Sequence, residues 1–158
     1  MTTTQTPAST STRSTLFPVP APVRDIGLLL ARVLLGVVLI AHGWEKFFTN
    51  GIAGTGEFFD SVGVPAAQAA ATFAGLVELV GGILLIIGLL TPVVAALVTI
   101  VMLGAFVFVH QEAGIYAADG GWELVAVIGL AVVVFGLVGP GRYSVDALIA
   151  GRRGGTEG

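Results

Sequence analysis

The sequence predicts an all-α, membrane-spanning antiparallel four-helix bundle with both termini in the cytoplasm. Its composition is the first reason: 55% of the residues are hydrophobic, 11% are charged, and the mean hydropathy is +0.96, whereas an ordinary soluble chain has roughly 25% charged residues. The second reason is a series of four apolar segments, each close to the roughly 20 residues that a helix needs to cross a bilayer. The third is the concentration of basic residues near the ends of the chain. A chain of 158 residues leaves no room for a separate soluble catalytic domain beside such a bundle.

Residues 1–24 are predicted to form a disordered cytoplasmic tail. They are rich in Ser, Thr and Pro and poor in large apolar side chains, so they cannot bury enough apolar surface to fold. They lack the charged start and the small-residue cleavage site of a secretory signal, and we therefore expect this segment to be retained. The transmembrane domain is expected over residues 25–149, and residues 150–158 are predicted to be a flexible cytoplasmic tail.

The four spans are predicted from the apolar runs and from the turn residues between them. Gly63 and Pro65 fit the end of one segment and the start of the next helix. The pair Thr91 and Pro92 predicts a very tight turn between the second and third spans. The last span is the shortest. The predicted spans are Asp25–Phe48, Ala66–Leu90, Pro92–His110 and Gly121–Val138.

Two shorter amphipathic segments accompany the spans. The segment GTGEFFDSVG, with Phe58 and Phe59 beside acidic residues, predicts either a helix that lies in the membrane interface or a structured loop. The segment SVDALIAG near the end of the chain predicts a short helix, because Ser144 suits an N-cap and Asp146 would fall in the first turn.

The orientation follows from the distribution of Lys and Arg in the short segments that flank the spans. An even number of spans puts both termini on one side, while the opposite side has only Lys46 and several acidic residues. This asymmetry predicts a multi-pass protein of the cytoplasmic (inner) membrane with both ends inside. The basic residues on the side of the termini are Arg13, Arg24, Arg142, Arg152 and Arg153.

Glu78 is the main candidate for a functional residue, because it lies within the otherwise apolar second span. A charged residue at the centre of a bilayer costs about 2.5–3.5 kcal/mol on insertion scales, so such residues usually face the interior of a bundle. Gly75 and Gly82 share the face of Glu78 at helical spacing. Small residues on that face predict that another helix packs closely against it.

The first span supplies polar partners for Glu78. The tilt of side chains on antiparallel helices directs Glu78 towards His42 and Lys46, although a direct pair with Arg32 is the alternative. His110 and Glu123 would join these residues in a pocket with Glu78 as its floor. Each has a simpler reading as well, such as a structural ion pair, a lysine that reaches the headgroups, or a first-turn acid at a helix terminus. The candidate ligand-binding residues are Arg32, His42, Lys46, Glu78 and Glu123.

Several kinds of chemistry are not expected in this chain. There is no cysteine, which excludes thiol nucleophiles, disulfides and iron–sulfur ligation by this chain. Haem ligation by the two histidines is a weak alternative. No metal site, flavin motif or nicotinamide motif is recognised, and no catalytic residue is identified. The basic residues form no face for nucleic acid.

An ordered set of motifs resembles the DoxX family of small four-helix membrane proteins. These motifs are R-x9-H-G-x2-K in the first span, ELVGG in the second, the LLTP turn, GWEL at the start of the fourth span and GPGRYSVD after it. The resemblance covers residues 25–149. It implies a redox setting at the cytoplasmic membrane, because the family name is tied to the membrane subunits of a thiosulfate:quinone oxidoreductase.

The sequence and the resemblance together predict a membrane accessory subunit of a redox system, linked to quinone, sulfur compounds or oxidative stress. Such a subunit would bind a quinone-like ligand or anchor a partner enzyme that carries the cofactor, without an intrinsic cofactor or a catalytic activity of its own. One alternative is a small transporter or proton-linked permeation unit, and another is a structural membrane scaffold. The oligomeric state is left open, with a homo-oligomer as one of the outcomes.

Overall fold

The computed structural model describes residues 19–154, and within this range every regular element is helical and no strand occurs. The all-α prediction is therefore confirmed. Residues 1–18, most of the predicted N-terminal tail, and residues 155–158 lie outside the described range. The elements are α1 (Ala21–Trp44), η1 (Glu45–Thr49), α2 (Gly51–Ser61), α3 (Ala67–Ile87), α4 (Thr91–Ala105), η2 (Phe106–His110), η3 (Ala117–Asp119), α5 (Glu123–Val138) and α6 (Val145–Gly154).

Three of the helical segments are long and apolar enough to cross a membrane. They are Ala21–Thr49, which joins α1 to the π-helical η1, Ala67–Ile87, and Thr91–His110, which joins α4 to the π-helical η2. Helix α5 is apolar as well but has only 16 residues. The chain is thus a membrane protein with three helices of spanning length, and the fourth span of the predicted bundle stays a prediction. Helix α1 begins at Ala21 and α6 continues to Gly154, so both helices extend into segments that were predicted as tails.

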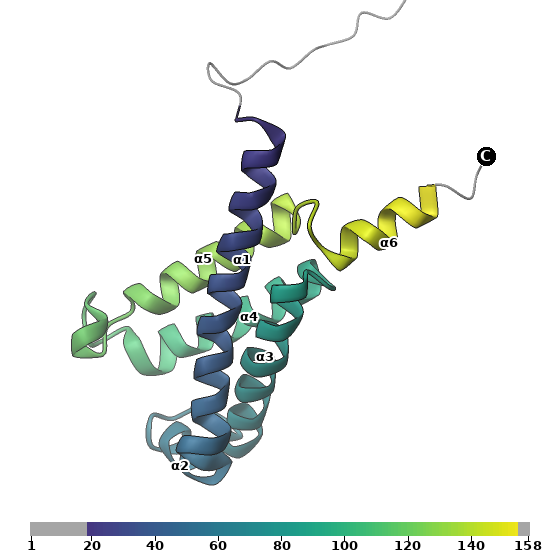
Figure 1. Ribbon diagram of the computed structural model, residues 1–158. Helices are drawn as coiled ribbons and strands as arrows, with labels where there is room; N and C mark the ends of the chain where they lie inside the picture. Colours follow the sequence, from purple (N-terminus) through teal and green to yellow (C-terminus); the bar gives the residue numbers. More distant parts are fainter. Residues whose placement is uncertain (1–18, 155–158) are drawn as a thin grey trace, which may run out of the picture.

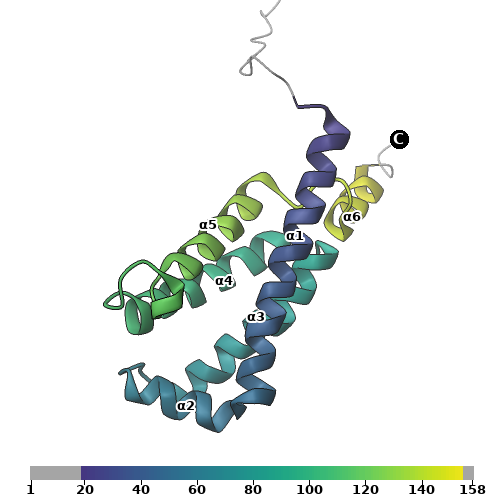
Figure 2. The same ribbon diagram turned by 60° about the vertical axis from the view of Figure 1, so that its left-hand side comes forward.

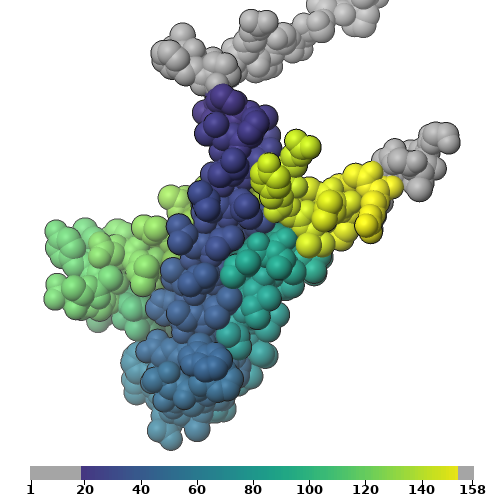
Figure 3. Space-filling model, viewed as in Figure 1, coloured from purple at the N-terminus to yellow at the C-terminus, as the bar shows by residue number. Residues whose placement is uncertain are grey.

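The helices pack as two pairs that diverge from each other. Helix α1 lies along α3, and α4 lies along α5 (Figures 1 and 2). The α4–α5 pair projects away from α1. Helix α2 packs against the N-terminal end of α3. Helix α6 stands off from the rest of the molecule on another side (Figure 3). The described ends of the chain, at α1 and α6, lie towards the same end of the molecule (Figure 1).

Glycines explain why α1 and α3 can approach so closely. A Cβ atom on Gly43 would lie 2.5 Å from the backbone N of Leu79, and one on Gly82 would lie 2.7 Å from the carbonyl O of Gly36. Neither position has space for a side chain, because the obstacle is backbone. The close helix approach predicted from the small residues beside Glu78 is confirmed here.

The turn between α3 and α4 is as tight as predicted. Gly88 ends α3 with a φ of +68°, and Leu90 has a φ of +54° immediately before Thr91 and Pro92 open α4. A left-handed conformation is unfavourable for a residue such as Leu90. It is held by the side chain of Asp146, whose carboxylate accepts hydrogen bonds from the backbone N–H groups of Leu90 and Thr91, both at 2.9 Å.

Both amphipathic segments are helical. Of the two alternatives for residues 54–63, the structure shows the helix, since most of this segment belongs to α2. The predicted short helix after the spans is α6, and Ser144 precedes it with its Oγ accepting a hydrogen bond from Ala147 N at 3.2 Å. The N-cap prediction for Ser144 is thus confirmed.

Candidate functional site

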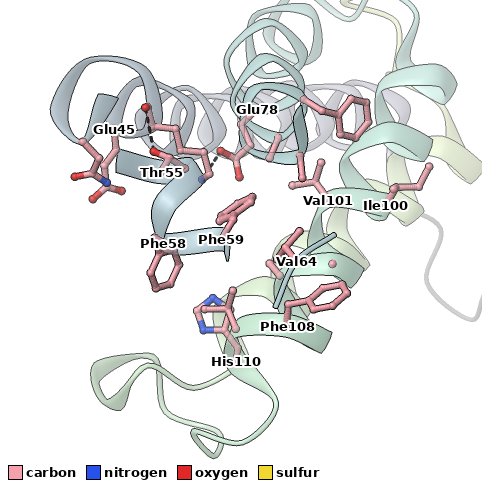
Figure 4. A pocket seen from close by; sticks show the side chains of 18 of the residues that line it. Glu45, Thr55, Phe58, Phe59, Val64, Glu78, Ile100, Val101, Phe108 and His110 are labelled. Atoms are coloured by element: carbon pink, nitrogen blue, oxygen red, sulfur yellow. Dashed lines mark hydrogen bonds and ion pairs between the residues drawn. The ribbon is translucent and has the colours of Figure 1, made fainter. Parts of the chain in front are cut away.

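A cavity of about 710 Å³ lies where the two helix pairs diverge, between α2, α3 and the C-terminal end of α4 (Figure 4). This volume falls within the roughly 300–1,000 Å³ that small-molecule pockets occupy. Its walls are largely apolar and aromatic. They include Phe58 and Phe59 from α2, Phe73 from α3, and Ile100 and Phe108 from α4 and η2.

Lys46 and Glu78 form an ion pair at the wall of this cavity, with 2.6 Å between Nζ and Oε2 (Figure 4). Only 5% of the Glu78 side chain and 17% of the Lys46 side chain are exposed. Apart from this pair, Oε2 of Glu78 has no hydrogen-bond partner among the described residues. Of the two partnerships considered for Glu78, the structure therefore shows the one with Lys46 and not the one with Arg32.

The position of Lys46 depends on a π-helical turn. The segment Glu45–Thr49 continues α1 with the wider π-helical geometry, and the hydroxyl of Thr55 on α2 lies within hydrogen-bond distance of the carbonyls of Lys46, at 3.2 Å, and Gly51, at 2.9 Å. A second π-helical turn, Phe106–His110, ends α4 on the facing side of the cavity. Single π-helical turns are frequent at functional sites because they redirect side chains that a regular helix would place elsewhere.

His110 lines the cavity from the end of η2 (Figure 4). Its Nδ1 lies 2.6 Å from the carbonyl O of Gly120, in the loop that leads to α5. The ring is therefore fixed by the backbone of that loop. The expectation that His110 and Lys46 share a pocket with Glu78 agrees with this arrangement.

The structure places His42 and Glu123 outside the cavity lining. His42 lies 3.9 Å from Glu45, measured from Nδ1 to Oε2, and its side chain is 39% exposed. Glu123 accepts a hydrogen bond from Ala117 N at 2.8 Å, which fixes the loop before α5. Two of the five candidate residues, Lys46 and Glu78, are thus brought together at the cavity.

Arg32 lies near the middle of α1, beside the C-terminal end of α3 and away from the cavity. Its side chain is among the most buried in the protein, with 1% exposure. The guanidinium donates hydrogen bonds to three backbone carbonyls, those of Ile86 at 3.3 Å, Tyr143 at 2.5 Å and Pro140. Gly88 makes room for it, since a Cβ there would lie 2.7 Å from Nη1. Arg32 thereby ties α1 to the end of α3 and to the segment that follows α5.

Asp146 strengthens the same end of the molecule. Burial raises the pKa of its carboxyl, but the backbone N–H groups of Thr91 and Leu90 outweigh that effect, and the pKa is lower than usual. The nearby positive charge of Arg32 acts in the same direction. The backbone N of Asp146 also donates to Gly88 O at 2.9 Å. Asp146 is therefore charged at neutral pH and connects α6 to the turn between α3 and α4.

Sequence reasoning did not identify the aromatic walls of the cavity or the carbonyl acceptors around Arg32. The pair Phe58 and Phe59 stood out as an apolar face, but the sequence does not show that this face meets Phe108 across a space. Glu45 also lines the cavity, although it was not among the candidate residues. Among residues 19–154, no group of three or more His, Asp or Glu side chains is placed to hold a metal ion.

The fold and the site define a small helical membrane protein with a polar pair set against an apolar cavity. The sequence model of the DoxX family matches residues 27–111. The chain belongs to the DoxX family, as its motifs predicted.

Curated relatives support this membership. The chain is 39% identical over 89 residues to "Putative oxidoreductase CatD" of Bacillus subtilis, a match that covers 56% of the chain and 63% of that protein, less than two thirds of its length. It is 34% identical over 137 residues to the membrane protein Rv3486 of Mycobacterium tuberculosis, with 79% of the chain and 82% of that protein covered. It is 31% identical over 132 residues to the inner membrane protein YqjF of Escherichia coli, with 80% and 95% covered. No solved structure matches the chain.

Proposed function

We propose that this protein is a membrane accessory subunit of a redox system and that it binds a quinone-like ligand in the cavity beside Lys46 and Glu78. The observation that carries the proposal is the buried ion pair at the wall of a largely apolar and aromatic cavity. Buried intramembrane charges are costly and usually mark a functional site. The name of the Bacillus subtilis relative, which points to an oxidoreductase, supports a redox role.

The chemistry of the cavity suits a quinone. The flat ring of a quinone is apolar and can pack against Phe58, Phe59 or Phe108. Its oxygens need hydrogen-bond donors when oxidised and acceptors when reduced, and the pair of Lys46 and Glu78 offers one of each. A lining of this kind, apolar with few polar groups, is typical of ligand pockets.

Exposed apolar side chains at the cavity favour entry of the ligand from the bilayer. Phe73 is 43% exposed and Ile100 is 57% exposed, and both line the cavity. In a membrane such side chains contact lipid, so a ligand with a long apolar tail can leave its tail between them. A quinone of the membrane pool has this form.

The proposal includes a topology and a partner. With α5 as the fourth span, the chain crosses the membrane four times and both termini lie in the cytoplasm, as the distribution of Arg residues favours. The chain has no cysteine, and no group of three or more His, Asp or Glu side chains among its described residues is placed to hold a metal ion. We therefore place the electron-carrying cofactor on a partner enzyme that this subunit anchors to the membrane.

A direct binding measurement tests the ligand. The purified protein in lipid nanodiscs is titrated with decylubiquinone, a short-tailed quinone, and binding is followed by equilibrium partition. Saturable binding is expected, and both Glu78→Gln and Lys46→Met should weaken it by about tenfold or more, since each removes one partner of the polar contact. Glu57→Gln is the matched control, because Glu57 is an exposed acid of α2 outside this cavity. An absence of saturable binding in the wild type would disprove the ligand assignment.

A second experiment tests the partner. Affinity purification from native membranes in mild detergent, followed by mass spectrometry, should recover a redox enzyme in stoichiometric amount. Recovery of the bare protein would count against the accessory-subunit role even where quinone binds.

A small proton-linked permeation unit is the second candidate function. One observation favours it: Glu78 is a carboxyl buried within a membrane-spanning helix at the wall of a cavity, and such groups occur in proton relays. Proteoliposomes should then show a proton flux that disappears in Glu78→Gln. Equal proton leak in the wild type and the variant would exclude this function.

A further inference from the structure

His110 gives the cavity a second polar group whose hydrogen-bonding role is fixed by the backbone. Its Nδ1 lies 2.6 Å from Gly120 O. A carbonyl oxygen can only accept a hydrogen bond, so the hydrogen must be on Nδ1. In a neutral imidazole the other nitrogen, Nε2, then has a free lone pair and is an acceptor.

The loop that supplies the Gly120 carbonyl is itself held in place. Gly120 has a φ of +83° and its N–H donates to Ala117 O at 3.0 Å. The N–H of Ala117 donates in turn to the carboxylate of Glu123 at 2.8 Å, and Gly121 N donates to Tyr116 O at 2.8 Å. These bonds keep the carbonyl directed at His110. The tautomer of His110 is therefore set by the loop and not by a ligand.

Nε2 of His110 has no hydrogen-bond partner among residues 19–154, and the side chain lines the cavity (Figure 4). The carboxylates of Glu78 and Glu45 are the other strong acceptors in the lining. Donors come from Lys46, which is already paired with Glu78, and from the amide of Asn50. A ligand that itself donates hydrogen bonds satisfies this set better than one that only accepts them.

We propose that the cavity binds the reduced, dihydroxy form of an aromatic ligand more tightly than the oxidised quinone, and that Nε2 of His110 accepts the hydrogen bond of one hydroxyl. The ligand class rests on the proposed function, whereas the preference for one redox form rests on the fixed tautomer of His110. The oxygens of a quinone are acceptors only, so they leave the lone pair of Nε2 without a donor. A ligand hydroxyl that donates to Nε2 gains a hydrogen bond that a quinone oxygen cannot make, and this difference favours the dihydroxy form.

The role assigned to His110 is that of a binding residue that determines specificity. It forms no covalent bond and transfers no electron, and its only interaction with the ligand is one hydrogen bond. If the subunit serves a partner enzyme, a site with this preference retains the quinol product or delivers quinol as the substrate. The partner would accordingly be an enzyme that reduces a quinone or oxidises a quinol at the membrane.

The experiment compares the two redox forms of one ligand. Decylubiquinol and decylubiquinone are titrated separately, without oxygen, into the full chain in nanodiscs. The wild type should bind the quinol about tenfold more tightly, the typical effect of one hydrogen bond. Equal affinities, or tighter binding of the quinone, would overturn the inference.

Two substitutions at position 110 separate the ligand from the loop. In His110→Asn the side-chain amide can still donate to Gly120 O but has no atom in the place of Nε2, so the preference for the quinol should be lost while quinone binding stays. In His110→Gln the amide oxygen reaches the place of Nε2, so most of the preference should return. A preference that persists in His110→Asn would show that His110 is not the acceptor.

The outcomes also separate this inference from the proposed function. If neither form binds saturably to the wild type, the assignment of a quinone ligand is wrong and this inference falls with it. If both forms bind with equal affinity, the ligand assignment holds and the inference alone is wrong. Thermal unfolding of each variant in the same nanodiscs shows that a loss of preference is not a loss of fold.

Discussion

Each end of the helix pair α1–α3 contains a buried cation, and the groups that surround the two cations differ. At one end, Arg32 is surrounded by backbone carbonyls and is 1% exposed. At the other end, Lys46 pairs with Glu78 at the wall of a cavity and keeps hydrogen-bonding capacity towards that space. The difference shows that a buried charge can be enclosed by backbone carbonyls or can border a cavity, depending on its neighbours.

The end around Arg32, which we call the closed end, connects all the long helices. Arg32 links α1 to the end of α3 and to the segment after α5, while Asp146 links α6 to the start of α4. At the end around Lys46, which we call the open end, α2 and η2 face each other across the cavity. Stability should therefore depend mainly on the closed end and ligand binding on the open end.

The largest effect on stability is expected for Arg32→Met. This change leaves three buried carbonyls without their charged donor, and hydrogen bonds to charged groups contribute about 1.5–3 kcal/mol each. The free energy of unfolding should fall by about 3 kcal/mol or more. It is measured by unfolding in increasing amounts of sodium dodecyl sulfate, followed by circular dichroism.

Arg32→Lys is the matched variant for this prediction. Lysine keeps the charge but lacks the planar fork that reaches several carbonyls at once, so an intermediate loss is expected. If Arg32→Met unfolds at the same detergent fraction as the wild type, the closed end does not hold the helices together.

A smaller, pH-dependent effect is expected for Asp146→Asn. Burial raises the pKa of Asp146, but the hydrogen bonds from the N–H groups of Thr91 and Leu90 lower it by more. The pKa in the folded protein therefore lies below the unfolded value, which is about 3.9. A group of this kind stabilises the fold above its unfolded pKa, and the contribution disappears as the pH falls through the folded pKa. At pH 7 the variant should lose about 1 kcal/mol, the usual effect of removing a capping carboxylate.

The check is the difference in unfolding midpoint between the wild type and Asp146→Asn as a function of pH. The difference should be full at pH 7. It should shrink as the pH falls below about 3.9, the unfolded pKa, towards the lower pKa of Asp146 in the folded protein. Glu57→Gln controls for the loss of one acidic charge. A difference that stays constant with pH would mean that the carboxylate charge of Asp146 does not stabilise the turn.

The smallest effect on stability is expected for the double variant Lys46→Met, Glu78→Gln. Removing both charges of a buried pair together is often neutral, because the cost of burying them disappears with their attraction. The free energy of unfolding should stay within about 1 kcal/mol of the wild type, while ligand binding is lost. A loss of stability as large as that of Arg32→Met would erase the contrast between the two ends.

The sequence predicted the helices well because each signal for them is local. Apolar runs of the required length, the Thr91–Pro92 turn and the Ser144 cap each depend on residues that are near in the chain. The glycines beside Glu78 also predicted close packing against another helix, since a stripe of small residues has few other uses in a membrane. These features needed no knowledge of the tertiary arrangement.

The site was predicted only in part, because depth along a helix does not determine what surrounds a side chain. Arg32 and Lys46 were both predicted as candidate ligand-binding residues of the first span, yet Arg32 is enclosed by the carbonyls of Ile86 and Tyr143 from distant segments. His42 shares the region of Lys46, but the π-helical turn at Glu45 redirects the chain and His42 stays outside the cavity lining. Neither the divergence of the helix pairs nor a π-helical turn has a signature in the residue pattern.

The shortness of α5 has a consequence for the lipid around the molecule. In the proposed topology α5 is the fourth span, and its 16 residues extend only about 24 Å, less than the roughly 30 Å of hydrocarbon in a typical bilayer. A short span is accommodated by local thinning of the bilayer or by flanking residues that reach the interface. Helix α5 packs along α4, whose C-terminal end borders the cavity. Thinning there would bring the water boundary closer to the cavity, so that protons and a polar headgroup would travel a shorter distance through hydrocarbon.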